Sequence, residues 1–295
     1  MSKHIDALFI QLLEEALGVS LTLINRKSLG GGSISQTCKV ETSEGVFFVK
    51  WNEQGPEDIF LREAESLAEL AKAGSNLKIP RVFASAARTK SSPGLLITEF
   101  LEPATAPRAE LDEQMGRGIA QLHRYHQESY GFYHDNYCGA TLQDNSRNKN
   151  WVDFFGNQRI GALLDKISGK RVMSKDERKT YDQFLDSLPK LIGHAPAASL
   201  NHGDLWSGNY LHSSAGPALV DPASYYADRE FDLAMMGMFG GFSDRVWQAY
   251  EEAYPLPPEW KERHELYKLY HYLNHYYLFG GSYGQQALSI ARSYL

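Results

Sequence analysis

The sequence predicts an α+β protein of two lobes, a smaller N-terminal lobe with an antiparallel sheet and a larger, mostly helical C-terminal lobe. Up to about residue 100, short β-rich runs alternate with glycine-containing turns. Pro103 and Pro107 then mark an extended connector. Beyond it, apolar residues recur mainly at helical spacing. We therefore expect one lobe over residues 1–100 and another over residues 101–295.

The elements of the N-terminal lobe follow from local patterns. The first 18 residues place their apolar side chains on one helical stripe. A second helix is predicted from Pro56 to about Ala73, because proline is favoured in the first turn of a helix. The predicted strands cover residues 21–27, 36–41, 46–51, 81–86 and 95–100.

The C-terminal lobe is predicted to be helical with one interruption. Leu111, Met115, Ile119 and Leu122 keep helical spacing. Further helices are predicted over residues 150–167, 175–188 and 259–278, and one strand-like island over residues 218–220. Crevices between lobes of this kind are common ligand sites.

Composition excludes several classes of protein. Of 295 residues, 43% are hydrophobic and 22% are charged, which is ordinary globular usage and not that of a disordered or coiled-coil chain. The formal net charge of −6 argues against binding of nucleic acid through an extended electropositive surface. No run approaches the roughly 18 apolar residues of a membrane span. We expect neither a nucleic-acid nor a membrane partner.

Cysteine usage indicates a reducing compartment. Cys38 and Cys138 are the only cysteines, and their wide spacing forms neither a disulfide framework nor a zinc knuckle. Asp6, Glu14 and Glu15 interrupt any apolar core of a signal peptide. We expect a cytoplasmic protein.

The clearest chemical motif is His202-Gly203-Asp204-Leu205-Trp206-Ser207-Gly208-Asn209, which has the H-x-D-L-x-x-x-N form of a kinase catalytic loop. Asp221 lies twelve residues after Asn209 and ends the apolar run 218–220. Kinases place a metal-binding aspartate at such a position. A polar surface turn is the alternative for the motif taken alone.

Phosphoryl transfer needs these residue types. A carboxylate must orient and deprotonate the attacking hydroxyl group, and we assign this role to Asp204. Asn209 offers an amide oxygen and Asp221 a carboxylate, which are ligands suited to Mg²⁺ bridging phosphates. A set made only of oxygen ligands does not suit zinc.

A second signal lies in the predicted N-terminal lobe. Gly31, Gly32 and Ser33 lie between the first two predicted strands, where glycines let backbone N–H groups approach phosphate oxygens. Lys50 ends the apolar strand one hairpin later, as the phosphate-binding lysine of a kinase does. A flexible hairpin and a solvated lysine are the alternatives for each feature alone.

The third signal is a carboxylate on an apolar stripe. In the helix predicted after Pro56, Glu63 falls in the middle of the apolar face. A buried carboxylate is costly unless it is paired, and Lys50 is its natural partner. The alternative is that Glu63 reaches solvent at the edge of the helix.

Together these segments resemble the fructosamine kinase (ketosamine-3-kinase) family. The resemblance is carried by residues 201–210, by Asp221-Pro222-Ala223 and by residues 228–234, and it extends over nearly the whole chain. The H-G-D-L-W-S-G-N string is similar to this family rather than to aminoglycoside or choline kinases. It implies a bilobal, protein-kinase-like fold and ATP-dependent phosphorylation of the 3-hydroxyl group of a ketosamine, a step of deglycation repair.

The resemblance also implies residue roles. Asp204 is implied as the base, with Asn209 and Asp221 on Mg²⁺ and with His202 and Asp232 supporting the catalytic loop. The implied ATP contacts, which make residues 1–100 the nucleotide-binding lobe, are Gly31, Gly32, Ser33, Lys50, Glu63 and the hinge Glu99, Phe100 and Leu101.

The implied substrate contacts are Trp206, His271 and His275. Trp206 follows the proposed base by two residues, so its indole is expected to stack on the sugar; a packed loop aromatic is the alternative. His271 and His275 have the spacing of a metal pair but lack the glutamate of H-E-x-x-H, so zinc is not expected there. Cys138 is expected to be a buried bystander.

Two other functions stay open from the sequence. The same fold could phosphorylate an aminoglycoside, a choline-like compound or another sugar amine. An inactive nucleotide-binding scaffold is the third possibility, although every catalytic position is filled. The expected partner is a small ketosamine or a glycated protein amine, and the expected state is a monomer or weak homodimer.

Overall fold

The structure, a computed structural model, describes residues 2–30, 35–171 and 173–295. Its N-terminal part holds a five-stranded antiparallel sheet with the strand order β1-β2-β3-β5-β4. The strands are β1 (Leu23–Leu29), β2 (Gln36–Thr42), β3 (Gly45–Asn52), β4 (Val82–Ala86) and β5 (Gly94–Glu99). All five predicted strands are therefore present, the first of them two residues further along the chain.

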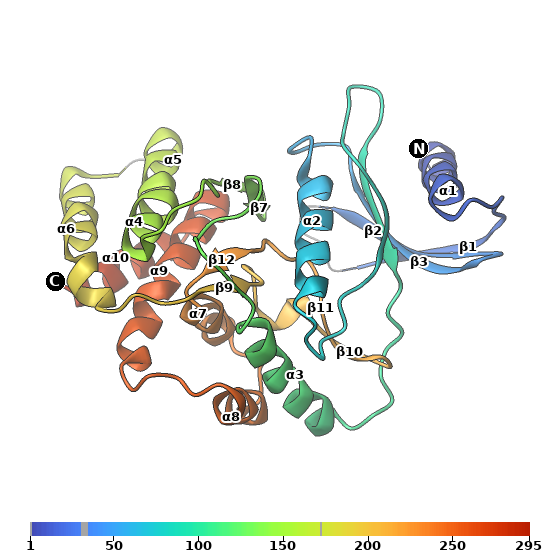
Figure 1. Cartoon of the computed structure of the whole chain (residues 1–295). Helices are drawn as coiled ribbons and strands as arrows, with labels where there is room; N and C mark the ends of the chain where they lie inside the picture. The colour runs from blue at the N-terminus through green and yellow to red at the C-terminus, as the bar shows by residue number, and fades with distance from the viewer. Residues whose placement is uncertain (1, 31–34, 172) are drawn as a thin grey trace.

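One helix covers each face of this sheet. The amphipathic helix α1 (Ser2–Leu17) packs on the outer face, and α2 (Ile59–Lys72) lies between the sheet and the rest of the chain (Figure 1). Because side chains alternate along a strand, Val49 of β3 packs in the core with α1, whereas its neighbour Lys50 points to the α2 side. The sheet thus presents Lys50 to the helical part.

The rest of the chain is mostly helical. Its helices are α3 (Arg108–Leu122), α4 (Trp151–Asp153), the π-helix η1 (Phe154–Gly161), α5 (Ala162–Lys170), α6 (Lys175–Ile192), α7 (Glu230–Phe239), α8 (Asp244–Ala253), α9 (Trp260–Phe279) and α10 (Tyr283–Ser293). The helix predicted over residues 150–167 is present as the consecutive turns of α4, η1 and α5. None of the helices in the described residues has an apolar stretch able to cross a bilayer.

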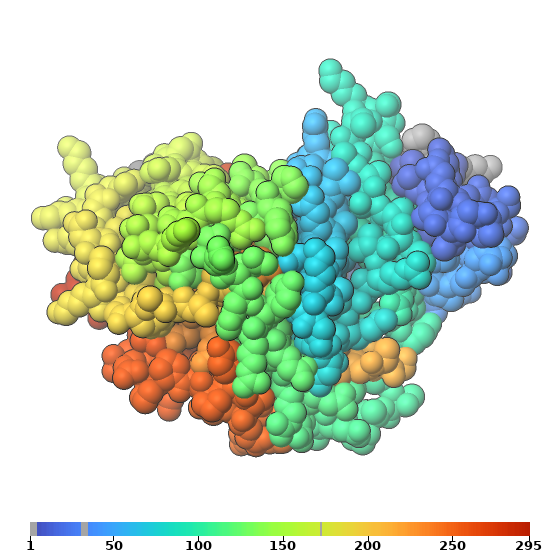
Figure 2. All heavy atoms as spheres, in the orientation of Figure 1, coloured from blue at the N-terminus to red at the C-terminus, as the bar shows by residue number. Residues whose placement is uncertain are grey.

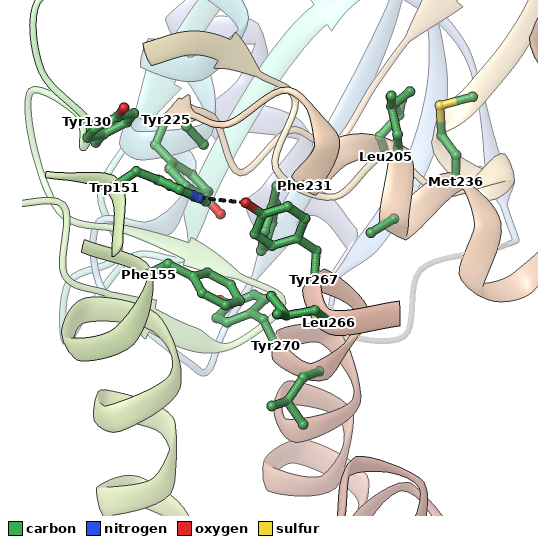
Figure 3. Packing of buried hydrophobic residues seen from close by; sticks show 14 of the residues in the cluster. Tyr130, Trp151, Phe155, Leu205, Tyr225, Phe231, Met236, Leu266, Tyr267 and Tyr270 are labelled. Atoms are coloured by element: carbon green, nitrogen blue, oxygen red, sulfur yellow. Dashed lines mark hydrogen bonds between the residues drawn. The ribbon is translucent and has the colours of Figure 1, made fainter. Parts of the chain in front are cut away.

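An aromatic core holds the helical part together. Figure 3 shows Trp151, Phe155, Phe231 and Tyr267 packed between α4, α7 and α9. The Trp151 indole N–H donates a hydrogen bond of 2.8 Å to the Tyr267 hydroxyl group, so the polar ends of these two buried rings are satisfied. This core fixes α7 and α9 behind the cleft described below.

The prediction of a single strand-like island in the helical part was wrong. The structure has β6 (His126–Gln127), β7 (Asn136–Cys138), β8 (Thr141–Gln143), β9 (Ala198–Asn201), β10 (Tyr210–Ser213), β11 (Gly216–Leu219) and β12 (Tyr225–Ala227). Strands of two to four residues are too short to display a period of two, so only the run at β11 was visible in the sequence. These strands form small antiparallel ladders, β12-β9-β6, β10-β11 and β7-β8.

The sheet and the helical part touch each other along α2. In the space-filling view of Figure 2, the cyan atoms of α2 abut the green atoms that follow α3. In the segment that follows α2, a backbone bridge joins Lys78 and Ala218, and Lys78 N donates a hydrogen bond of 2.8 Å to Pro217 O. The cleft lies on this boundary.

Candidate active site

A cleft of about 890 Å³ separates the sheet from the helical part. Its sheet side includes Lys50, Leu96 and the segment after β5, and its helical side includes Asp204 and Asp221. Residues far apart in the sequence therefore meet in one cavity.

The loop after β9 is held in a shape that requires glycine. Gly203 has a φ of 85°, and a Cβ atom there would lie 2.1 Å from the carbonyl oxygen of Ala223. The loop therefore lies directly against the segment that follows Asp221. A short 3₁₀ helix, η2 (Ser207–Asn209), completes the turn into β10.

Asp232 of α7 braces this loop from behind, as predicted. Its carboxylate accepts hydrogen bonds from the backbone N–H groups of His202 at 2.6 Å and Gly203 at 2.9 Å. Burial alone would raise the pKa of Asp232, but the hydrogen bond and charge from His123 and the other donors outweigh it and hold the pKa below its ordinary value. Asp232 is therefore a fully buried, ionised anchor.

The side chain of His202 also supports the loop after β9. Its side chain is buried, and Nε2 lies 3.0 Å from the backbone oxygen of Val220. Because a carbonyl oxygen only accepts, Nε2 must carry the proton and donate. The ring thus ties the loop to the strand end that presents Asp221.

Asp204 lies in the cleft with a strongly perturbed acidity. Burial raises the pKa of Asp204 to about 7, the charge of Asp221 adds to this, and the hydrogen bond from Asn209 opposes it. The amide Nδ2 of Asn209 lies 2.9 Å from the backbone oxygen of Asp204 and 3.3 Å from its Oδ2. A carboxyl group of this pKa can take up a proton near neutral pH.

The predicted ion pair between Lys50 and Glu63 is present. Nζ of Lys50 lies 2.9 Å from Oε2 and 3.1 Å from Oε1 of Glu63. It also lies 3.0 Å from Oδ1 of Asp221, a contact that the sequence did not suggest. Burial lowers the pKa of Lys50, but Glu63 and Asp221 outweigh this and hold it above its ordinary value. Burial raises the pKa of Glu63, and Lys50 opposes that effect.

The oxygen donors of this site fit a hard divalent cation. Asn209 uses its amide nitrogen on Asp204, which leaves its Oδ1 free as an acceptor. Asp221 has a φ of 54°, a left-handed conformation uncommon for a residue other than glycine. Its carboxylate is 48% exposed and lines the cleft. These ligand types are the ones that Mg²⁺ prefers.

The remaining predicted ATP contacts lie at the sheet side of the cleft. Glu99, Phe100 and Leu101 all line it. Gly31, Gly32 and Ser33 lie outside the described residues, although Gly30 and Ser35 beside them line the cleft.

Two of the three predicted substrate contacts line the cleft, and one does not. Trp206 and His275 line the cleft, and Trp206 is 39% exposed, with its ring lying over Gly208, where a Cβ atom would be 2.2 Å away. His271 is not among the lining residues: it is 1% exposed and packs on Phe231 with ring centroids 4.7 Å apart. The expectation of a direct substrate contact at His271 is therefore corrected. It lies one turn before His275, where α7 covers α9.

Sequence reasoning missed the hairpin β7–β8 as a wall of the cleft. Cys138 is buried, as expected, but it also lines the cleft together with Asn136. Nδ2 of Asn274 lies 3.3 Å from the Cys138 sulfur. No signal in the sequence marked this hairpin, because each of its strands has only three residues.

Comparisons with known proteins identify the family of this chain. A family model described as fructosamine kinase matches residues 5–295. A probable ketoamine kinase of Vibrio parahaemolyticus is 39% identical over 94% of this chain and 94% of its own length. Mouse ketosamine-3-kinase is 33% identical over 96% of this chain and 98% of its own.

Solved structures give the same result for the fold. The crystal structure of a candidate fructosamine-3-kinase from Thermobifida fusca has a TM-score of 0.86 at 30% identity and covers 97% of each chain. An aminoglycoside phosphotransferase in a ternary complex with AMP-PNP and hygromycin B has a TM-score of 0.65 at 17% identity, covers 96% of this chain and 98% of its own, and shares the fold alone. The protein-kinase-like fold predicted from the sequence is confirmed. Matched over residues 5–295 by the family model and over nearly their full length by its relatives, the chain belongs to the fructosamine kinase family.

Proposed function

We propose that this chain is an ATP-dependent kinase that phosphorylates the 3-hydroxyl group of ketosamines, which are amines carried by a rearranged sugar. The observation that carries the proposal is the convergence of Asp204, Asn209 and Asp221 with the Lys50–Glu63 pair in one cleft of a family member. A phosphate group at the 3-position makes the adduct unstable, so the amine is released and the reaction repairs glycation.

ATP is assigned to the sheet side of the cleft. Lys50, held by Glu63, would neutralise the α- and β-phosphates. The backbone of Glu99, Phe100 and Leu101 would meet the adenine ring. Residues 1–100 would then form the nucleotide-binding lobe and residues 101–295 the catalytic and substrate-binding lobe, since β5 ends at Glu99.

Asn209 and Asp221 would hold Mg²⁺ through their side-chain oxygens. When bound, the metal supplies positive charge that neutralises the phosphate oxygens. The unusual backbone conformation of Asp221 and its exposed carboxylate support this role, because they aim the side chain into the cleft.

Asp204 is assigned as the general base. The 3-hydroxyl oxygen of the ketosamine forms the new bond to the γ-phosphorus, and the bond from that phosphorus to ADP breaks. The hydroxyl proton passes to the Asp204 carboxylate, whose pKa of about 7 suits this transfer near neutral pH. Trp206 would cover the sugar, since it lines the same cleft two residues after Asp204.

An ATP-consumption assay tests the proposal. The panel contains fructosyl-, ribulosyl- and erythrulosyl-amines, free sugars, aminoglycosides and choline, and NMR locates the phosphorylated carbon. We expect turnover of ketosamines with the phosphate at C3. Turnover confined to aminoglycosides or choline would show that the chain phosphorylates the acceptors of other kinases of this fold. Nucleotide binding without any phosphate transfer would indicate an inactive scaffold.

Two further proposals concern the state of the protein. We propose that it works in the cytoplasm as a monomer or weak homodimer. Light scattering over a range of concentrations and fractionation of cells would test them.

A further inference from the structure

The cleft has an aromatic wall that the phosphoryl-transfer groups do not use. It consists of Trp206, Phe239, His275, Phe279 and Tyr283, all of which line the cleft. Ring centroids are 6.3 Å apart for Trp206 and Phe239, and 5.2 Å apart for Phe239 and His275. They are 5.8 Å apart for His275 and Phe279, and 5.0 Å apart for His275 and Tyr283. The rings thus form a continuous surface.

This surface is open to a ligand. Phe239 is 45% exposed and Phe279 is 59% exposed, although phenylalanine side chains are more often buried. Exposed apolar side chains that gather in one cavity mark a binding site more often than scattered ones do.

Two helices end at this wall. Phe239 is the last residue of α7 and Phe279 is the last residue of α9, and each is followed by two glycines. Gly240 and Gly280 have φ values of 69° and 74°, so both helices stop there. The C-terminus of a helix carries a partial negative charge and favours cations. Lys170 and Arg171 already contact the backbone oxygen of Tyr277 in the last turn of α9, so the end of α7, beside Phe239, is the one left to favour a ligand cation.

His275 adds a hydrogen-bond acceptor. Its Nδ1 lies 2.8 Å from the backbone oxygen of His271, so Nδ1 carries the proton and donates. Burial lowers the pKa of His275, which keeps the ring neutral near pH 7. Its Nε2 then has a free lone pair.

The charged side chains that line the cleft differ between its two sides. Among the described lining residues, the helical side carries Asp204 and Asp221, whereas the sheet side carries both signs, with Lys50 and Arg62 beside Glu63 and Glu99. The helical side, to which Phe239 and Phe279 belong, therefore offers a cationic ligand two carboxylates within the same cleft.

We propose that the aromatic wall binds the protonated secondary amine of the ketosamine, through cation–π contacts with Phe239 and Phe279 and a hydrogen bond from the ammonium group to Nε2 of His275. This inference rests on the proposed function, because it assigns the amine end of the same substrate. The sugar lies between Trp206 and Asp204, and the substituent on the amine leaves the cleft past Phe279 and Tyr283. The favoured substrates carry an alkyl or aryl group on the amine.

Matched substrates test the inference at pH 7. One is an N-hexyl fructosamine, and the other is the ether in which oxygen replaces the N–H group and removes the charge. We expect the wild-type protein to favour the amine in kcat/KM by about tenfold, since a cation–π contact and one charge-assisted hydrogen bond contribute on this order. Phe279→Leu keeps an apolar side chain without a ring, and it should lower the amine-to-ether ratio about threefold. Phe279→Tyr keeps the ring and should preserve the ratio.

The outcomes separate this inference from the proposed function. Equal kcat/KM values for amine and ether, with phosphate still placed at C3, would overturn the ammonium site and leave the kinase assignment intact. A loss of activity in Phe279→Leu that is the same for both substrates would also overturn it, because the wall would then be merely apolar. Failure of the wild-type protein to phosphorylate either compound would instead contradict the proposed function.

Discussion

In the proposed function, one carboxyl group, that of Asp204, accepts the proton of the attacking hydroxyl group. We predict that Asp204→Asn lowers kcat by at least about 100-fold, because an amide cannot take the proton of the attacking hydroxyl group. The affinity for ATP should change little, since Lys50 and the hinge lie across the cleft. Steady-state kinetics and calorimetric ATP titration would check both. Turnover near the wild-type rate would contradict the assignment of the base.

The same residue predicts a pH dependence. Burial raises the pKa of Asp204 to about 7, and a base works only when it is deprotonated. We therefore expect kcat/KM to fall tenfold per pH unit below about 7 and to level off above it. A profile that is flat from pH 5.5 to 8 would show that another group accepts the proton.

The contribution of Asp204 to stability should fall as the pH rises, whereas its contribution to activity should increase. A carboxyl group whose pKa is higher in the folded than in the unfolded state stabilises the fold below its unfolded value, and this contribution is lost as the pH rises through about 7. Asp204→Asn removes the cost of a buried charge. Its melting temperature relative to the wild-type protein should therefore be higher at pH 8 than at pH 4, as calorimetry at both pH values would measure.

Some residue contacts were predictable and others were not. The apolar stripe of residues 59–70 identified Glu63 as a carboxylate in need of a partner, and Lys50 is that partner. The contact of Lys50 with Asp221 could not be predicted, because it spans 171 positions and depends on how the two parts of the chain dock. Likewise, helical spacing put His271 and His275 on one face but could not show that α7 buries the first of them.

At the scale of elements, α2 links the docking of the two parts of the chain to Lys50, the proposed phosphate contact. Beyond Glu63 this helix carries Glu69, which is 1% exposed. Glu69 accepts hydrogen bonds from the hydroxyl groups of Tyr226 at 2.5 Å and Tyr133 at 3.0 Å, both in the helical part. The position of α2, and with it the Lys50–Glu63 pair, is therefore tied to the far side of the cleft.

We predict that Glu69→Gln raises the KM for ATP severalfold and lowers the free energy of unfolding by about 1–3 kcal/mol, because the buried Tyr226 hydroxyl group and the Tyr133 hydroxyl group lose a charged acceptor. The KM for the ketosamine should change less, since Glu69 acts through α2. Lys72→Ala is the matched control: it removes only the exposed partner of Glu69, a surface ion pair that contributes about 1 kcal/mol or less. If both KM values rise equally in Glu69→Gln, the effect is general unfolding and not the position of α2.

The elements themselves were predictable to different degrees. The strands of the five-stranded sheet are long enough to show alternation, and residues 42–45 and 91–94 are rich in turn-forming residues. The strands around residues 202–209 have two to four residues and are set by pairing with distant partners, as β9 is with β12 and β6. The π-helical turns of η1 were also invisible, because their apolar spacing differs little from that of an α-helix.

At the scale of the whole molecule, the cleft should couple ligand binding to stability. Mg²⁺-ATP would contact both the sheet and the helical part, so it binds the folded state and not the unfolded chain. At a concentration of 100 times Kd, such a ligand stabilises a protein by about 2.7 kcal/mol, which raises Tm by several degrees in a chain of this size. We predict this shift with Mg²⁺ and ATP together and a much smaller one when EDTA removes the metal.

Asp221→Asn provides the specific version of this test. The substitution weakens one of the two proposed Mg²⁺ ligands, so the difference in Tm between Mg²⁺-ATP and ATP with EDTA should shrink toward zero. Asp182→Asn is the control, because Asp182 lies on α6 in an exposed ion pair with Arg178, away from the cleft. Its metal-dependent shift should equal that of the wild-type protein. An undiminished shift in Asp221→Asn would mean that the metal is held elsewhere, and the converging oxygen donors of the cleft would then lose their assigned role.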